Sequence, residues 1–195
     1  MSALFGTNLF HIAHVGTDLD AMVDNMLQSG IGPWFYARDL NLNSRYRGEQ
    51  HDLVISVAFG FTGHLMFELV VQDNDVPSSF SEYLDRRPEG GLHHIAWMSD
   101  DLEASIAAAE AKSGKKLVKV QEFLMADGNP SEIYMETEGA TDPILMQIVL
   151  PSPWDDAFAK VRDIAATWDG SEPRRNMFDL LPDSLMAALA DGHPA

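Results

Sequence analysis

The sequence predicts an α+β fold built from two copies of a strand-helix-strand-strand-strand unit. The pattern His-Ile-Ala-x-x-x-x-Asp-Leu begins at His11 and begins again at His94, 83 residues later. Helical spacing of apolar residues follows each copy, and three strand-like segments follow each helix. A self-match at one fixed offset indicates a duplicated structural unit, so we expect the two halves to share one architecture.

The first unit is expected over residues 9–72. Thr17 or Asp18 can cap its helix, and Gly30 to Pro33 ends it. Alternating apolar residues predict the strands, which we place at residues 9–15, 35–42, 53–59 and 65–71.

The second unit is expected over residues 92–150, after a connector at 73–91 that contains one short helix. Asp100 or Asp101 caps its main helix, and Ser113-Gly114 ends it. A C-terminal extension at 151–195 lies outside the duplication. The strands of the second unit are expected at 94–98, 117–124, 133–137 and 144–150. In the extension, helices are expected at 154–168 and, more weakly, at 185–189.

Composition excludes several functional classes. The 195 residues carry 13 basic and 30 acidic side chains, a net charge of −17 that repels nucleic acid. There is no cysteine, which removes disulfides and thiolate metal sites. No long apolar run and no secretion signal stand out, so we expect a cytoplasmic protein without a membrane partner.

Each unit carries two polar side chains in otherwise apolar strands. His11 and His94 stand in the first strands, and Glu68 and Gln147 stand in the last strands. Histidine nitrogens with carboxylate or amide oxygens suit a divalent metal that keeps open positions. The sequence therefore predicts one divalent metal ion held by His11, Glu68, His94 and Gln147.

Taken singly, each of these residues would more commonly be an ordinary core or strand-end residue. Their duplicated positions favour the metal site over that interpretation. His94 is preferred to His93 as the ligand because only His94 keeps the offset and strand parity of His11.

These residues resemble the vicinal oxygen chelate superfamily, which includes glyoxalase I, methylmalonyl-CoA epimerase, extradiol dioxygenases and bleomycin-binding proteins. The segment Gly91 to Ala96 is especially similar to the epimerases. The resemblance covers residues 9–150 and implies paired βαβββ modules whose curved mixed sheets enclose a metal-binding cavity. The order of Glu68 first and Gln147 second departs from the epimerase pattern, which has Gln first and Glu second.

The resemblance implies an isomerase or epimerase that removes a proton beside a carbonyl through a metal-stabilised enolate. The position of its general base corresponds loosely to Glu49, with His51 as the alternative; Glu132, Tyr134 and Glu136 fall near the equivalent place in the second unit. Arg45, Arg47 and Tyr134 are the candidate substrate-binding residues. For the bases and arginines alike, solvated surface positions are the commoner outcome.

Three other activities stay open. A glyoxalase-type lyase and an Fe(II) ring-cleaving dioxygenase use similar ligands, and a small-molecule-sequestering protein can use the same scaffold. In each case we expect a small-molecule partner, which is a carbonyl compound for the enzymes. We also expect a homodimer, because the extension is typical of segments that pack on their own body or on a second subunit.

Overall fold

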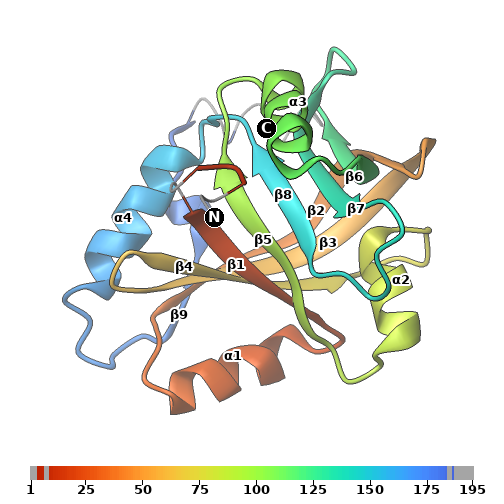
Figure 1. The fold of residues 1–195 in the computed structure, drawn as a ribbon. Helices are drawn as coiled ribbons and strands as arrows, with labels where there is room; N and C mark the ends of the chain where they lie inside the picture. Colours follow the sequence, from red (N-terminus) through yellow and green to blue (C-terminus); the bar gives the residue numbers. More distant parts are fainter. Residues whose placement is uncertain (1–3, 7–8, 184–185, 187–195) are drawn as a thin grey trace.

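The computed structural model describes residues 4–6, 9–183 and 186. Over these residues a nine-stranded sheet and its helices form an α+β fold, as predicted (Figure 1). The first half contains β1 (Leu9–Gly16), α1 (Leu19–Gln28), β2 (Trp34–Tyr46), β3 (Glu49–Thr62) and β4 (Leu65–Gln72). The second contains β5 (Gly91–Met98), α3 (Leu102–Ser113), β6 (Leu117–Leu124), β7 (Pro130–Thr137) and β8 (Leu145–Val149). Outside the two halves lie α2 (Ser79–Arg86), α4 (Asp155–Ala165), β9 (Arg174–Asn176) and the 3₁₀ helix η1 (Met177–Leu180).

The strand register repeats between the halves. β1 runs parallel to β4 with Ala13 opposite Glu68, and β5 runs parallel to β8 with Ala96 opposite Gln147. The two halves join where β1 pairs antiparallel with β5. This seam places the first strands of both copies side by side at the centre of the sheet.

The sheet closes on itself. Its order is β3-β4-β1-β5-β8-β7-β6-β2, and β2 also pairs with β3. The closure depends on the length of β2, which runs past the predicted residues 35–42 so that Ser44 to Tyr46 reach β6. Closure removes exposed strand edges and encloses an interior large enough for side chains and a ligand.

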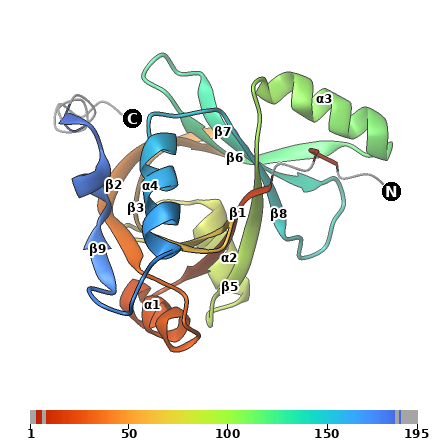
Figure 2. The same ribbon diagram turned by 90° about the vertical axis from the view of Figure 1, so that its left-hand side faces the viewer.

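The two helices outside the modules cover the two ends of this ring. Figure 2 looks along the ring, with α4 in front of the opening and α2 behind it. Phe80 and Tyr83 of α2 and Val161 of α4 belong to the core cluster inside the ring. The predicted extension helix at 154–168 is observed at Asp155–Ala165, whereas the weak helix expected at 185–189 lies outside the described residues apart from Met186.

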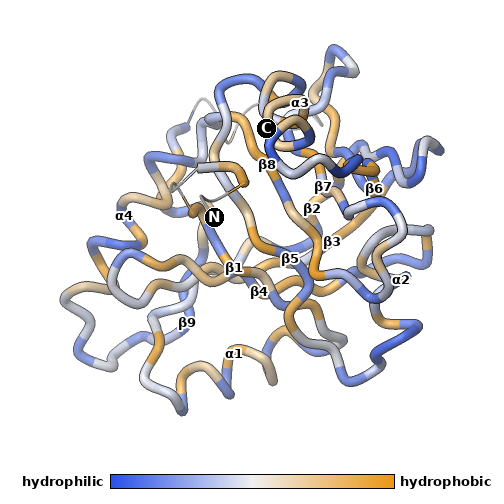
Figure 3. Tube along the Cα trace, viewed as in Figure 1, coloured by the Kyte–Doolittle hydropathy of each residue, from blue (hydrophilic) through white to orange (hydrophobic). Residues whose placement is uncertain are grey.

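The module helices cover the outer face. Asp18 and Asp101 cap them by accepting hydrogen bonds from the backbone amides of Ala21 and Ala104. α1 packs Leu19 and Val23 against β2, β3 and β4, and α3 packs a matching apolar face against β7 and β8. Along α1 and α4, hydrophobic and hydrophilic stretches alternate (Figure 3), as expected for helices with one buried face. None of the helices in the described part of the chain is long and apolar enough to cross a membrane.

Candidate active site

The ring encloses a cavity of about 430 Å³. Its walls come from both halves and from the extension, and most of the lining side chains are apolar or aromatic. The polar lining residues that bear on the chemistry are His11, Glu68, Glu132, Tyr134 and Gln147. A mainly apolar cavity with a few convergent polar groups is the usual form of a small-molecule site.

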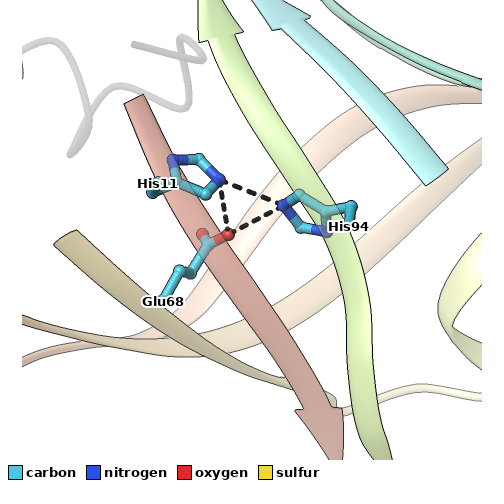
Figure 4. Close-up of side chains that lie close together, drawn as sticks. All are labelled: His11, Glu68 and His94. Carbon is cyan, nitrogen blue, oxygen red and sulfur yellow. Dashed lines mark hydrogen bonds and ion pairs between the residues drawn. The ribbon is translucent and has the colours of Figure 1, made fainter. Parts of the chain in front are cut away.

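His11, Glu68 and His94 converge at the seam between the modules (Figure 4). The Nε2 atoms of the two histidines lie 3.0 Å apart, and Glu68 Oε2 lies 3.3 Å from each of them. The three side chains come from β1, β4 and β5, which are adjacent strands, so the backbone fixes their convergence.

A hydrogen-bond relay sets the tautomer of His94. His93 Nε2 lies 3.2 Å from the carbonyl oxygen of Ser79, which only accepts, so His93 carries its proton on Nε2. His93 Nδ1 then accepts from His94 Nδ1, 2.9 Å away, which leaves a bare lone pair on His94 Nε2. Burial lowers the pKa of His93 to about 3 and that of His94 to about 4, so both rings are neutral at pH 7.

A β-bulge makes this relay possible. Ala13 pairs with His94 while the next residue, His14, pairs with Leu92, so His93 is the extra residue of β5. Both His93 and His94 are buried as a result. The rings of Phe80 and Tyr83 hold His93 from the α2 side, with centroids 5.0 and 5.4 Å away.

Gln147 lines the same cavity and is oriented by Glu132. Its Nε2 donates to Glu132 Oε2 at 2.6 Å, which leaves its Oε1 buried without a hydrogen-bond partner. Burial, followed by the negative charge of Glu68, raises the pKa of Glu132 to about 7. Glu132 is therefore a cavity carboxyl group that exchanges a proton near neutral pH.

The donor set fits a divalent metal ion. Two imidazole nitrogens and a carboxylate oxygen at 3.0–3.3 Å repel one another unless a cation or a proton stands between them. Metal bonds of about 2.1 Å at angles between 90° and 109° separate neighbouring ligand atoms by about 3.0–3.4 Å. Burial alone raises the pKa of Glu68, but the interactions with His11 outweigh it and hold that pKa well below its usual range. His11, Glu68 and His94 therefore give a nitrogen and oxygen set suited to such an ion, and Gln147 offers a further free oxygen, Oε1, in the same cavity.

The structure does not bring the two predicted bases to this cavity. Glu49 is exposed at the start of β3 and His51 lies two residues later, and neither is a lining residue. The inward face of β3 continues past the cavity, because fully buried Leu53 packs in the same core cluster as Phe80 of α2. Strand parity was sufficient to predict the inward face, but the cavity lining on β3 does not extend to Glu49 and His51.

The predicted substrate-binding residues separate into two groups. Arg45 binds Glu122 at 3.0 Å, and Arg47 binds Glu82 of α2 at 2.9 Å, so both are engaged in ion pairs away from the cavity lining. Tyr134 does line the cavity, with its ring centroid 4.8 Å from that of His94. A third arginine, Arg38, does reach the lining, where it pairs with Asp20.

Sequence reasoning missed two features of the site. His93 was set aside because strand parity points it away from the cavity, and nothing in the sequence signals the bulge. The extension contributes Trp154, Phe158 and Phe178 to the cavity wall. Their aromatic character was visible, but their distance in sequence from the duplicated units gave no reason to place them at the site.

Comparison with known proteins gives a family match. A family model described as "Glyoxalase/Bleomycin resistance protein/Dioxygenase superfamily" matches residues 10–129. Among curated proteins, none matches the sequence.

Solved structures are similar to this chain at low sequence identity. Methylmalonyl-CoA epimerase from Mycobacterium tuberculosis is 17% identical, with 75% of this chain and 89% of that chain covered and a TM-score of 0.48. A variant of 4-hydroxymandelate synthase from Streptomyces coelicolor is 13% identical, with 74% and 48% covered and a TM-score of 0.41.

Proposed function

This chain belongs to the Glyoxalase/Bleomycin resistance protein/Dioxygenase superfamily, and from that premise we propose that it is a divalent-metal-dependent enzyme acting beside a carbonyl group. The proposed reaction is an isomerisation or epimerisation that begins with removal of a proton from the carbon next to that carbonyl. The convergence of His11, Glu68 and His94, of which His11 and Glu68 line the cavity, is the observation that carries the proposal.

The proposed ligands are His11, Glu68, His94 and Gln147. The relay through His93 keeps His94 Nε2 unprotonated, and the hydrogen bond to Glu132 turns Gln147 Oε1 away from other donors. A bound divalent ion would supply Lewis-acid polarisation of a substrate carbonyl.

We assign proton transfer to Glu132 in place of Glu49. Glu132 lines the cavity and lies next to Gln147, whereas Glu49 is exposed and outside the cavity lining. A carboxylate with a pKa of about 7 is basic enough to accept a carbon-bound proton and acidic enough to return it. Return of the proton by Glu132 to the adjacent carbon of the enediolate would give isomerisation, whereas epimerisation would require a second proton donor on the opposite face of the same carbon.

Metal titration tests the ligand assignment. We expect the wild-type protein, stripped and then titrated with Mn²⁺ in a calorimeter, to bind one equivalent. His94→Ala and Glu68→Ala should abolish that binding, and His14→Ala should leave it unchanged, because His14 stands on β1 outside the cluster. Equal Mn²⁺ affinity in His94→Ala and wild type would refute the proposed site.

A second activity is favoured by a specific observation. Two histidines and one carboxylate are the ligand set of non-haem Fe(II) oxygenases. Protein loaded anaerobically with Fe²⁺ should then consume oxygen when a catechol is added, whereas the isomerase proposal expects no oxygen uptake. The oxygen electrode therefore separates the two reactions at the same site.

A further inference from the structure

We propose that the substrate is a compact, uncharged carbonyl compound carrying an aromatic ring, held by a pocket that the C-terminal extension completes. This inference rests on the proposed function, because it names the substrate class of the same site. It starts from the cavity wall beside His11, where five aromatic side chains gather. They are Phe10, Phe59, Trp154, Phe158 and Phe178.

Phe158 of α4 is the centre of this aromatic wall. Its ring lies 4.9 Å from Phe59 and 5.7 Å from Phe10, both edge-to-face, and 6.3 Å from Trp154. These distances suit aromatic pairing, and the edge-to-face arrangement leaves ring faces available to a further ring. The three aromatic residues of the extension, Trp154, Phe158 and Phe178, are partly exposed and line the cavity.

The wall adjoins the candidate metal cluster. Phe10 precedes His11 on β1, with ring centroids 5.0 Å apart, and Phe59 stands opposite Glu68 in the β3–β4 pairing. A ligand whose oxygens reach the cluster therefore has its adjoining group against the aromatic wall. An aryl ketone or an aryl-substituted hydroxyketone has the required arrangement of oxygens and ring.

Charge argues against a phosphorylated or nucleotide-bearing substrate. Among the described lining residues, Arg38 is the sole arginine and there is no lysine, and Arg38 is already paired with Asp20 at 2.9 Å. The chain carries a net charge of −17. Phosphate groups are held well by several cations, and this lining offers one arginine that is already paired.

Calorimetric titration of the Mn²⁺-loaded full chain tests the inference with three probes. 2-Hydroxyacetophenone and hydroxyacetone share the same pair of oxygens but carry a phenyl and a methyl group, and acetoacetyl-coenzyme A carries a nucleotide. We expect 2-hydroxyacetophenone to bind at least about tenfold more tightly than either of the others, because the phenyl group buries more apolar surface. Equal affinity for hydroxyacetone, or tighter binding of the thioester, would overturn the inference.

Variants assign the preference to the wall. Phe158→Leu should reduce the phenyl-to-methyl affinity ratio at least about threefold and leave Mn²⁺ affinity unchanged. Phe5→Leu is the matched control, because Phe5 packs on Trp97 away from the cavity. If Phe158→Leu does not fold, Phe178→Leu takes its place. An unchanged ratio in a folded variant contradicts the assignment.

Failure of the inference can be told from failure of the proposed function. Stoichiometric Mn²⁺ binding without any phenyl preference rejects the substrate class and keeps the metal site. A phenyl preference in protein that binds no Mn²⁺ keeps the aromatic pocket and rejects the metal-dependent function.

Discussion

At the scale of single residues, the relay from Ser79 through His93 to His94 explains how a buried histidine presents a lone pair. A carbonyl oxygen can only accept, so each proton position along the relay follows from the one before. His93 thus acts on the cluster through His94 and is a positioning residue.

His93→Leu should weaken Mn²⁺ binding about 10- to 100-fold, the usual effect of losing the partner of a ligating histidine. His93→Gln should partly restore it, since the amide offers both an acceptor for His94 and a donor for Ser79. Calorimetry with Mn²⁺ measures both, and thermal melts confirm folding. A folded His93→Leu protein with wild-type affinity would show that the relay does not orient the ligand.

Glu132→Gln tests the proposed proton transfer by Glu132. The amide occupies the same space but cannot accept the proton, so exchange of the acidic C–H of 2-hydroxyacetophenone in heavy water should slow about 10²- to 10⁴-fold. Mn²⁺ affinity should change far less. Glu49→Gln is the matched control and should exchange at the wild-type rate, because Glu49 is exposed outside the cavity.

At the scale of elements, α4 both closes the ring and supports the cavity wall. Val161 is fully buried inside the core cluster, while Phe158 faces the cavity. One helix therefore contributes to stability and to ligand binding through different side chains.

Val161→Ala should lower the free energy of unfolding by about 1–3 kcal/mol, because it leaves space in a packed core. Asp163→Ala, at an exposed position of the same helix, should change it by less than about 0.5 kcal/mol. Urea denaturation measures both.

Deleting residues 152–195 should lower the melting temperature or change the oligomeric state, and no change in either would mean that α4 adds nothing to the fold.

At the scale of the whole molecule, the buried ionisable groups make stability depend on pH with opposing signs. His93 and His94 have folded pKa values near 3 and 4, below the unfolded value of 6.5, so the unfolded state binds more protons and acid destabilises the fold. Glu132 has a folded pKa near 7 against 4.5 in the unfolded state, so it binds its proton more tightly in the folded state. Its contribution therefore makes the fold more stable as the pH falls over the same range.

Consider the metal-free protein between pH 6 and pH 5. His93 and His94 bind about two more protons in the unfolded state than in the folded state, and Glu132 binds about one more in the folded state. The net difference of one proton predicts a loss of about 1.4 kcal/mol in the free energy of unfolding. Burial lowers the pKa of His14 as well, which adds to the loss. In Glu132→Gln the opposing contribution disappears, so the loss should roughly double, to about 2.8 kcal/mol. Urea denaturation at the two pH values measures this, and a smaller loss in the variant would contradict the assignment of a raised pKa to Glu132.

The sequence alone was sufficient for the α+β class and for the shared position of His11, Glu68 and His94. Both follow from local regularities of the sequence. One is a motif that recurs at a fixed separation along the chain, and the other is the alternation of side chains between the two faces of a strand. These fix which residues face inward and which correspond between halves, and the observed register of Ala13 with Glu68 and Ala96 with Gln147 agrees.

Only the tertiary structure decided how far that inward face remains open. Glu49 has the parity of a cavity residue, but it is exposed and lies outside the cavity lining, and the end of a cavity leaves no mark on strand periodicity. The same holds for the bulge at His93, for the closure of β2 onto both β3 and β6, and for the approach of Phe158 to Phe59. Each depends on contacts between segments far apart in the chain, whose energies are set by packing rather than by local sequence.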